Sequence, residues 1–397
     1  GYLTYQSSLQ FQKKSNQMKR FSFTITTLLL LAFTNLIYGQ EKRVNFDNEY
    51  IKNNNDKTTI EINETQELVY LILSITDLGT STPNMTNQNT EYFKEVKAHF
   101  GQYSSLPVVQ KFNTLLSENL INYFILGTNA YGFEFDGNKI VPTNVYNFLA
   151  KGVGNFIVEI NPIVTYRKDL EEFAEKSGYR KFYKNHKKYY SDLKSEYQKY
   201  AAIEEQKKWL ENKFDFKINS YRVLTSPLIA GLNATQTFED NNFKEILLFL
   251  PTIRNNKQWS EKFNQAINTR IIFTEIDHNY VGPDSEKNIE TINSIFDKRE
   301  KWVNVENKGT EHYPNALRVY DEYLTWGTFI LYSYDKYGSE KELFNQIVEN
   351  VNDMMINKKG FPKAKEFNEE LLNLYKKSED KKMEGLYKPL FEWSRKQ

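Results

Sequence analysis

The stretch Ile271-Ile272-Phe273-Thr274-Glu275-Ile276-Asp277-His278-Asn279-Tyr280 places an acid and an imidazole inside an otherwise apolar run. Apolar residues recur at helical spacing on both sides of it, so we expect one long helix that ends at Gly282-Pro283. At about 100° per residue, Glu275 and His278 project from one helix face about one turn apart. Both side chains can therefore reach one ion.

This pair has the chemistry of a metal site. A neutral imidazole is a good zinc ligand, and a carboxylate one turn away can either bind the metal or take a proton from metal-bound water. A second carboxylate has to come from elsewhere in the chain. Glu322 is the best candidate, because it interrupts a second amphipathic helix, rich in aromatic residues, that we expect over residues 316–337.

Taken together, these features resemble the glutamate-liganded zincin metallopeptidases. In both, strands precede a helix with a His-Glu-x-x-His-like pentad, and a second helix supplies a distant Glu. Residues 273–283 and 321–326 more closely resemble a family of uncharacterised secreted bacterial proteins related to those peptidases, over roughly residues 60–340. The resemblance implies that Glu275 is the general base. It also implies that His278 and Glu322 bind a divalent metal, zinc being the first choice, and that the substrate is a peptide or protein.

The chain departs from that pattern at Thr274, which stands where the first histidine of the pentad belongs. A threonine hydroxyl is a poor zinc ligand, so one of three protein donors is lost. Either Glu275 becomes a ligand in a site for a harder cation, or the metal is gone and the fold persists as a pseudoenzyme. His312 is a further option for the missing imidazole, and Asp277 is expected beside the metal ligands or on the helix surface.

The rest of the chain predicts an α+β protein that is mainly helical. Residues 214–251 contain four apolar runs separated by Pro227 and Gly231, which predict a small antiparallel sheet ahead of the active-site helices, a zincin-like architecture. We expect an N-terminal, mostly helical region over residues 40–213 and a zincin-like lobe over residues 214–397. Capping signals place helix starts after Asn63 and at Pro107.

The N-terminus and the composition indicate where the protein acts. Residues 18–39 begin Met-Lys-Arg, continue through four leucines and end in Gly39, the pattern of a cleavable signal peptide; residues 1–17 precede that methionine. We therefore expect a secreted or periplasmic protein without a permanent membrane span. Lysine and arginine number 52 against 51 acids, which argues against nucleic acid as a partner. Cysteine is absent, which excludes thiol chemistry and disulfides.

Two functions remain open at this level. The first is a metal-dependent peptidase in which Glu275 activates water for attack on a peptide bond. The second is a catalytically inactive pseudopeptidase of the cell envelope that uses the old cleft to bind peptide or glycan.

Overall fold

A computed structural model describes residues 42–153 and 155–397, and these form two compact units. Unit 1 contains residues 42–195 (except 154) and 218–252, and unit 2 contains residues 196–217 and 253–397. The predicted signal peptide and the segment before it lie outside the described residues. Among the described residues, no helix combines the length and the apolar character needed to cross a membrane.

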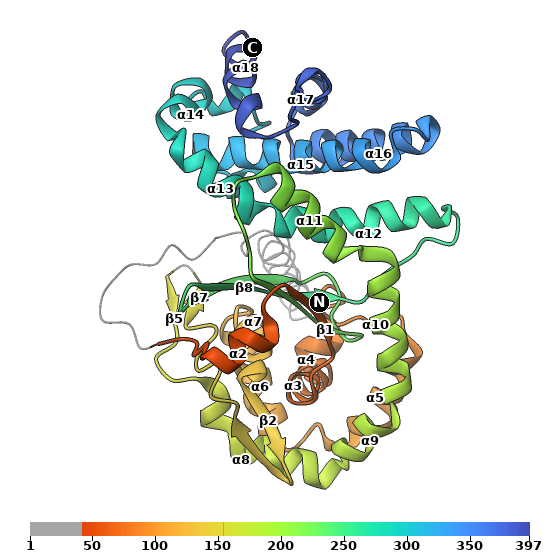
Figure 1. Ribbon diagram of the computed structural model, residues 1–397. Coiled ribbons are helices and arrows are strands. Elements are labelled where there is room, and N and C mark those ends of the chain that lie inside the picture. Colours follow the sequence, from red (N-terminus) through yellow and green to blue (C-terminus); the bar gives the residue numbers. More distant parts are fainter. Residues whose placement is uncertain (1–41, 154) are drawn as a thin grey trace, which may run out of the picture. The chain divides into compact units, whose positions relative to one another are not determined.

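Unit 1 contains a four-stranded sheet and a set of helices, most of which lie below the sheet in the view of Figure 1. Its helices are α2 (Asn48–Asn54), α3 (Glu64–Ser74), α4 (Asp77–Ser81), α5 (Glu91–Phe100), α6 (Pro107–Glu118), α7 (Asn122–Asn129), α8 (Pro162–Ser177), α9 (Tyr179–Asn185) and most of α10 (Lys187–Ala201). The sheet strands are β1 (Lys57–Glu61), β6 (Ser220–Ser226), β7 (Ala234–Asp240) and β8 (Phe243–Pro251). Two small hairpins are formed by β2 (Phe133–Asp136) with β3 (Lys139–Pro142) and by β4 (Gly152–Val153) with β5 (Phe156–Ile157).

The prediction of a mainly helical α+β protein is confirmed, but the prediction of an antiparallel sheet is wrong. The strand order is β1-β6-β8-β7, with β1 and β8 parallel to β6 and only β7 antiparallel to its neighbour. The loop at 227–233 carries the chain past one strand position, so β8 inserts between β6 and β7. The β7–β8 turn is built on Asn241 and Asn242, both with left-handed φ (50° and 57°), a conformation that asparagine tolerates.

The sheet also belongs to unit 1 and not to the C-terminal helices. β1, which comes from the N-terminal half of the chain, pairs with β6 in a register that sets Thr59 opposite Arg222. The two units therefore do not coincide with the expected regions 40–213 and 214–397. Every residue of β6 is buried, so this strand is covered on both faces.

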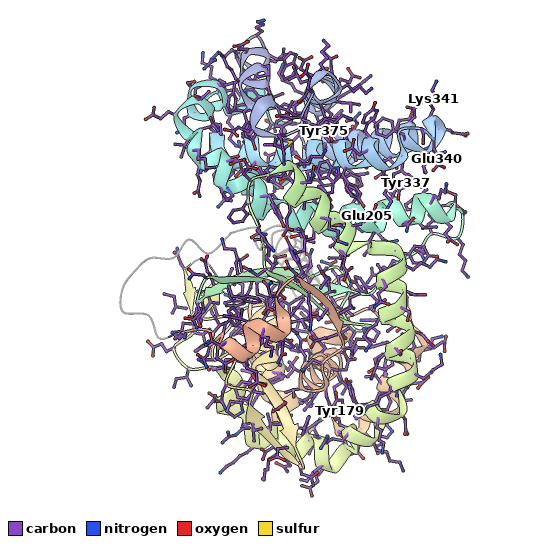
Figure 2. All side chains as sticks on the ribbon, in the orientation of Figure 1. Tyr179, Glu205, Tyr337, Glu340, Lys341 and Tyr375 are labelled. Carbon is purple, nitrogen blue, oxygen red and sulfur yellow. The ribbon has the colours of Figure 1, made fainter. Side chains whose placement is uncertain are left out.

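Unit 2 is entirely helical among its described elements. It contains α11 (Ile203–Lys213), α12 (Glu261–Ile276), α13 (His278–Lys287), α14 (Ile289–Phe296), α15 (Ala316–Tyr337), α16 (Lys341–Asp353), α17 (Ala364–Lys377) and α18 (Glu384–Ser394), with the 3-10 turn η4 (Lys308–His312) and the π-helical turn η5 (Met354–Lys359). The long helix α15 contacts α12, α13, α14, α16 and α17 and forms the centre of the unit. Aromatic side chains such as Tyr375 fill its interior (Figure 2).

The long helix predicted up to Val281 is interrupted at Asp277. α12 ends at Ile276 and α13 begins at His278, while the φ and ψ of Asp277 (−69° and −19°) stay close to helical values. The helix also does not stop at Gly282-Pro283, because α13 runs through both residues to Lys287. Asp277 is therefore the joint between two successive helices, and His278 is the first residue of the second.

Candidate functional site

The structure brings together two of the predicted site residues, His278 and Glu322. His278 begins α13 and Glu322 lies in the second turn of α15. The imidazole Nε2 and the carboxylate Oε2 are 3.9 Å apart. The Glu322 side chain is 2% exposed and that of His278 is 25% exposed, so the acid is enclosed while the ring reaches solvent.

The Glu322 carboxylate already has a cation beside it. The ammonium of Lys359 lies 2.8 Å from Oε1, and the indole Nε1 of Trp326 donates a hydrogen bond of 2.9 Å to the same oxygen. Burial would raise the pKa of Glu322, but the positive charge of Lys359 and the hydrogen bonds from Lys359 and Tyr313 outweigh burial and hold that pKa below its usual value. An enclosed carboxylate that keeps its charge needs such partners.

Lys359 is also stabilised as a cation. Its ammonium donates a hydrogen bond of 3.0 Å to the Tyr313 hydroxyl and lies 5.4 Å from the centre of the Trp326 ring. Burial would lower the pKa of Lys359, yet Glu322 and Tyr313 raise it above the ordinary lysine value. Glu322 and Lys359 therefore form a buried ion pair beside the rings of Tyr313 and Trp326.

A local backbone feature presents Lys359 to Glu322. α16 continues into the π-helical turn η5, a kind of turn often found at functional sites, and Lys359 is its last residue. Gly360 then ends the turn with φ +82°, and a Cβ at this position would lie only 2.9 Å from the Thr310 methyl carbon. Glycine satisfies both requirements. Lys359 does not stand out in the sequence, because Lys358-Lys359-Gly360 resembles an ordinary basic helix end.

His278 is held as a neutral ring. Burial is the largest influence on its pKa and lowers it; the negative charge of Glu322 opposes this, and the positive charge of Lys359 adds to it. Its Nδ1 lies 3.3 Å from the Thr325 hydroxyl, which fixes the ring against α15. At 3.9 Å, Nε2 is too far from Glu322 for a direct hydrogen bond, so it can take part in one with a bound molecule.

The remaining predicted residues lie on α12 and in η4. The Thr274 hydroxyl donates to the backbone carbonyl of Arg270 at 3.1 Å, within its own helix. Glu275 is half-buried on α12, and its negative charge helps to raise the pKa of Asp277. His312 lies in η4, half-buried, and burial lowers its pKa.

Asp277 is fully buried at the joint between α12 and α13. Neither of its carboxylate oxygens has a hydrogen-bond partner of regular geometry. Burial raises its pKa well above the ordinary value, and the negative charges of Glu322 and Glu275 raise it further. Asp277 thus contributes an acid close to the His278–Glu322 pair without contacting a cation of its own.

The donor set does not fit zinc. Within the described part of the chain, no three histidine or acidic side chains gather in a way that could hold a metal ion. His278 and Glu322 supply two donors, and the ammonium of Lys359 already occupies one oxygen of Glu322. Zinc sites in proteins generally use three or four protein ligands, and a cation next to a ligand oxygen opposes metal binding.

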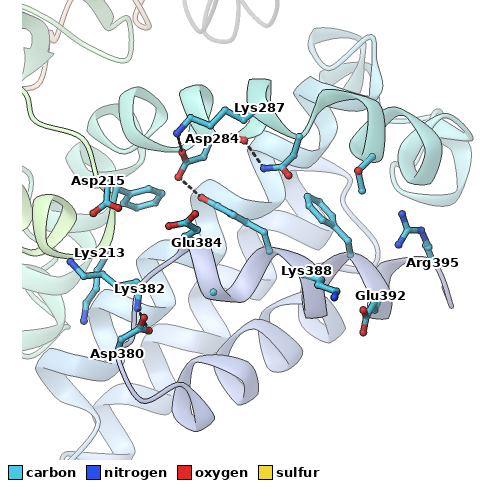
Figure 3. A pocket seen from close by; sticks show the side chains of 16 residues that line it. Lys213, Asp215, Asp284, Lys287, Asp380, Lys382, Glu384, Lys388, Glu392 and Arg395 are labelled. Atoms are coloured by element: carbon cyan, nitrogen blue, oxygen red, sulfur yellow. Dashed lines mark hydrogen bonds and ion pairs between the residues drawn. The ribbon is translucent and has the colours of Figure 1, made fainter.

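Unit 2 also contains an open cleft of about 980 Å³ lined by α13, α14, α18 and residues 213–215 (Figure 3). Its acidic and basic side chains neutralise one another; Asp284, for example, pairs with Lys287 at 2.9 Å and accepts a hydrogen bond from Tyr387. The lining rings of Tyr387 and Phe391 are 7% and 4% exposed. This cleft therefore offers no open aromatic face on which a sugar could stack.

Comparisons with models of protein families, with curated proteins and with solved structures find nothing that matches this chain.

Proposed function

We propose that the protein is an exported, non-catalytic peptide-binding protein in which the cation of Lys359 stands in place of a metal ion. The ion pair between Lys359 and Glu322, at 2.8 Å, carries this proposal. In the zincin-like arrangement implied by the sequence, Glu322 is the distant metal ligand. A lysine ammonium supplies the positive charge that a buried carboxylate needs, and it does so without activating water.

The state of Thr274 supports the same proposal. Its hydroxyl bonds to its own helix, at the position where the resemblance requires an imidazole. A threonine at position 274 and a lysine beside Glu322 are complementary, because the first is a poor metal ligand and the second neutralises the buried acid.

The exposed groups of the site suit a peptide. The side chain of Lys359 is 21% exposed and that of His278 is 25% exposed, while Glu322 is enclosed. A neutral imidazole can exchange hydrogen bonds with the N–H and C=O groups of a peptide backbone. Beneath these two groups, the Tyr313 hydroxyl accepts a hydrogen bond from Lys359 and the Trp326 indole donates one to Glu322, so both charged side chains are held in place.

The second candidate is the metal-dependent peptidase, which the closeness of His278 and Glu322 favours. Under that alternative His278 and Glu322 would hold a divalent ion in place of the ammonium of Lys359, and Glu275 would act as general base. The two candidates differ in metal content, which elemental analysis of untagged protein dialysed against zinc measures directly.

We expect wild-type protein to retain no zinc and to hydrolyse no peptide. The double variant Thr274→His/Lys359→Met restores the missing imidazole and removes the competing cation, so it should bind about one zinc per chain. Adding Glu322→Gln to that variant is the matched control and should abolish the gain. Stoichiometric metal in the wild type, lost in His278→Ala, together with hydrolysis lost in Glu275→Gln, would instead establish the peptidase.

A further inference from the structure

Arg270 is a buried cation without an anionic partner. It lies on α12 and is 8% exposed. Its Nε is shielded from solvent and makes no hydrogen bond, whereas the two terminal nitrogens are not among the enclosed atoms. The tip of the guanidinium thus reaches the surface from inside the unit.

Other buried cations show how unusual this is. Four lysine or arginine residues are buried in the described part of the chain: Lys207, Lys213, Arg222 and Arg270. The first three pair with acids at 3.0 to 3.3 Å: Glu211, Asp335 and Glu245. Arg270 forms no ion pair with any described residue, and burial alone lowers its pKa to about 10. It remains charged at neutral pH, and a buried charge without a counter-ion is costly.

Arg270 adjoins the candidate site through one shared side chain. Its guanidinium carbon lies 4.8 Å from the centre of the Trp326 ring, and the same indole donates its Nε1–H to Glu322. The ammonium of Lys359 lies 5.4 Å from the centre of that ring. An indole face holds the guanidinium in place and leaves its two terminal nitrogens available to a ligand.

We infer that Arg270 binds a carboxylate group of the peptide ligand. A guanidinium presents parallel N–H donors that match the two oxygens of a carboxylate. Glu322 already neutralises Lys359, and the single charge of Arg270 matches a carboxylate, which is a monoanion. This assignment rests on the proposed function, because it names the part of the peptide that the site recognises.

In the experiment, titration calorimetry measures the binding of four probes to the full chain. The probes are an N-acetylated tetra-alanine with a free C-terminal carboxylate, the same peptide as its C-terminal amide, the amide with one alanine replaced by glutamate, and inorganic phosphate. The protein variants are Arg270→Met, which removes the charge, and Arg270→Lys, which keeps the charge but not the fork. Zinc content is measured in every sample.

We expect at least one carboxylate peptide to bind about 10 to 100 times more tightly than the uncharged amide, the range for a hydrogen bond to a charged group. Tighter binding of the free acid assigns the C-terminal carboxylate, and tighter binding of the glutamate peptide assigns an acidic side chain. Arg270→Met should remove that advantage and Arg270→Lys should retain part of it.

Three results would overturn the carboxylate site: equal affinities of the amide and both carboxylate peptides for wild type, an undiminished advantage in Arg270→Met, or tighter binding of phosphate than of either carboxylate peptide. The wild-type comparison of acid with amide holds even if a variant fails to fold. Bound zinc in the wild type counts against the proposed function alone, since it does not alter the comparison of peptides at Arg270.

Discussion

Replacing Lys359 by methionine tests the ion pair that carries the proposed function. Methionine keeps an unbranched chain of similar length beside the rings of Tyr313 and Trp326 and removes only the cation. Removing one partner of a buried ion pair costs about 3 to 5 kcal/mol. Glu322 keeps the hydrogen bond from Trp326, so we expect the lower end, about 3 kcal/mol at neutral pH. For a unit of this size that corresponds to a fall in Tm of about 6 to 12 °C.

Tryptophan fluorescence reports on unit 2, which contains Lys359. All five tryptophans lie in unit 2: Trp209, Trp259, Trp302, Trp326 and Trp393. Urea unfolding followed by tryptophan emission therefore measures the stability of the unit that contains Lys359. Lys358→Met is the matched control, because Lys358 is exposed and its loss should change stability by less than about 0.5 kcal/mol.

The pH dependence gives a second, independent readout. The folded pKa of Glu322 is depressed, so its contribution is present above the ordinary carboxyl pKa and is lost as the pH falls through the folded value. The folded pKa of Lys359 is raised, so its contribution is present below the ordinary lysine pKa and is lost as the pH rises through the folded value. The pair is thus fully effective between about pH 5 and pH 10.

In Lys359→Met the ammonium no longer opposes the effect of burial on the pKa of Glu322, so that pKa should rise. Protonation of Glu322 in acid should then reduce the loss of stability. We expect the difference from wild type to be largest near neutral pH and to shrink below about pH 5. A loss under about 1 kcal/mol at neutral pH, or a loss that stays constant from about pH 4 to pH 7, would refute the reasoning.

Three further predictions concern the other buried charges. In the absence of ligand, Arg270→Met should raise the Tm of unit 2 in a fluorescence melt, because an uncompensated charge is removed; a lower Tm would mean that stacking on Trp326 outweighs that cost. Burial raises the pKa of Glu67 to about 7, so the free energy of unfolding of unit 1 should fall by about 3 kcal/mol as the pH rises from 4.5 to 7. Glu67→Gln should remove most of this pH dependence when unfolding is followed by the near-ultraviolet circular dichroism of tyrosine. Arg222→Met leaves Glu245 fully buried without a cation and should cost about 3 to 5 kcal/mol, visible as faster amide hydrogen exchange in β6 and β8; unchanged exchange would contradict this.

Local signals in the sequence predicted the helices well. The Asn63 side chain accepts from the backbone N–H of Gln66 at 2.9 Å, and Pro107 occupies the first turn of α6, as the capping patterns indicate. Helix ends depend on side chains and backbone groups a few residues apart, so one stretch of sequence contains the necessary information. The break at Asp277 escaped prediction because the backbone there stays close to helical.

The sheet required information that neighbouring residues do not hold. Pairing of β1 with β6 joins residues far apart in sequence, which periodicity cannot predict. One signal was nevertheless present: residues 246–250 are five consecutive apolar residues, the pattern of a strand that is covered on both faces and has parallel neighbours. An antiparallel strand with one exposed face would alternate polar and apolar residues instead.

The candidate site divides in the same way. Spacing within the pentad pointed to His278, and the acid inside an aromatic helix pointed to Glu322, but neither pattern can name the residue that neutralises that acid. A carboxylate at 2% exposure that keeps its charge needs a cation beside it, and only the fold shows that Glu322 is so enclosed. The fold also identifies that cation as Lys359. A buried cation likewise needs an anion beside it. Arg270 is such a cation, and under our proposal a ligand supplies the anion.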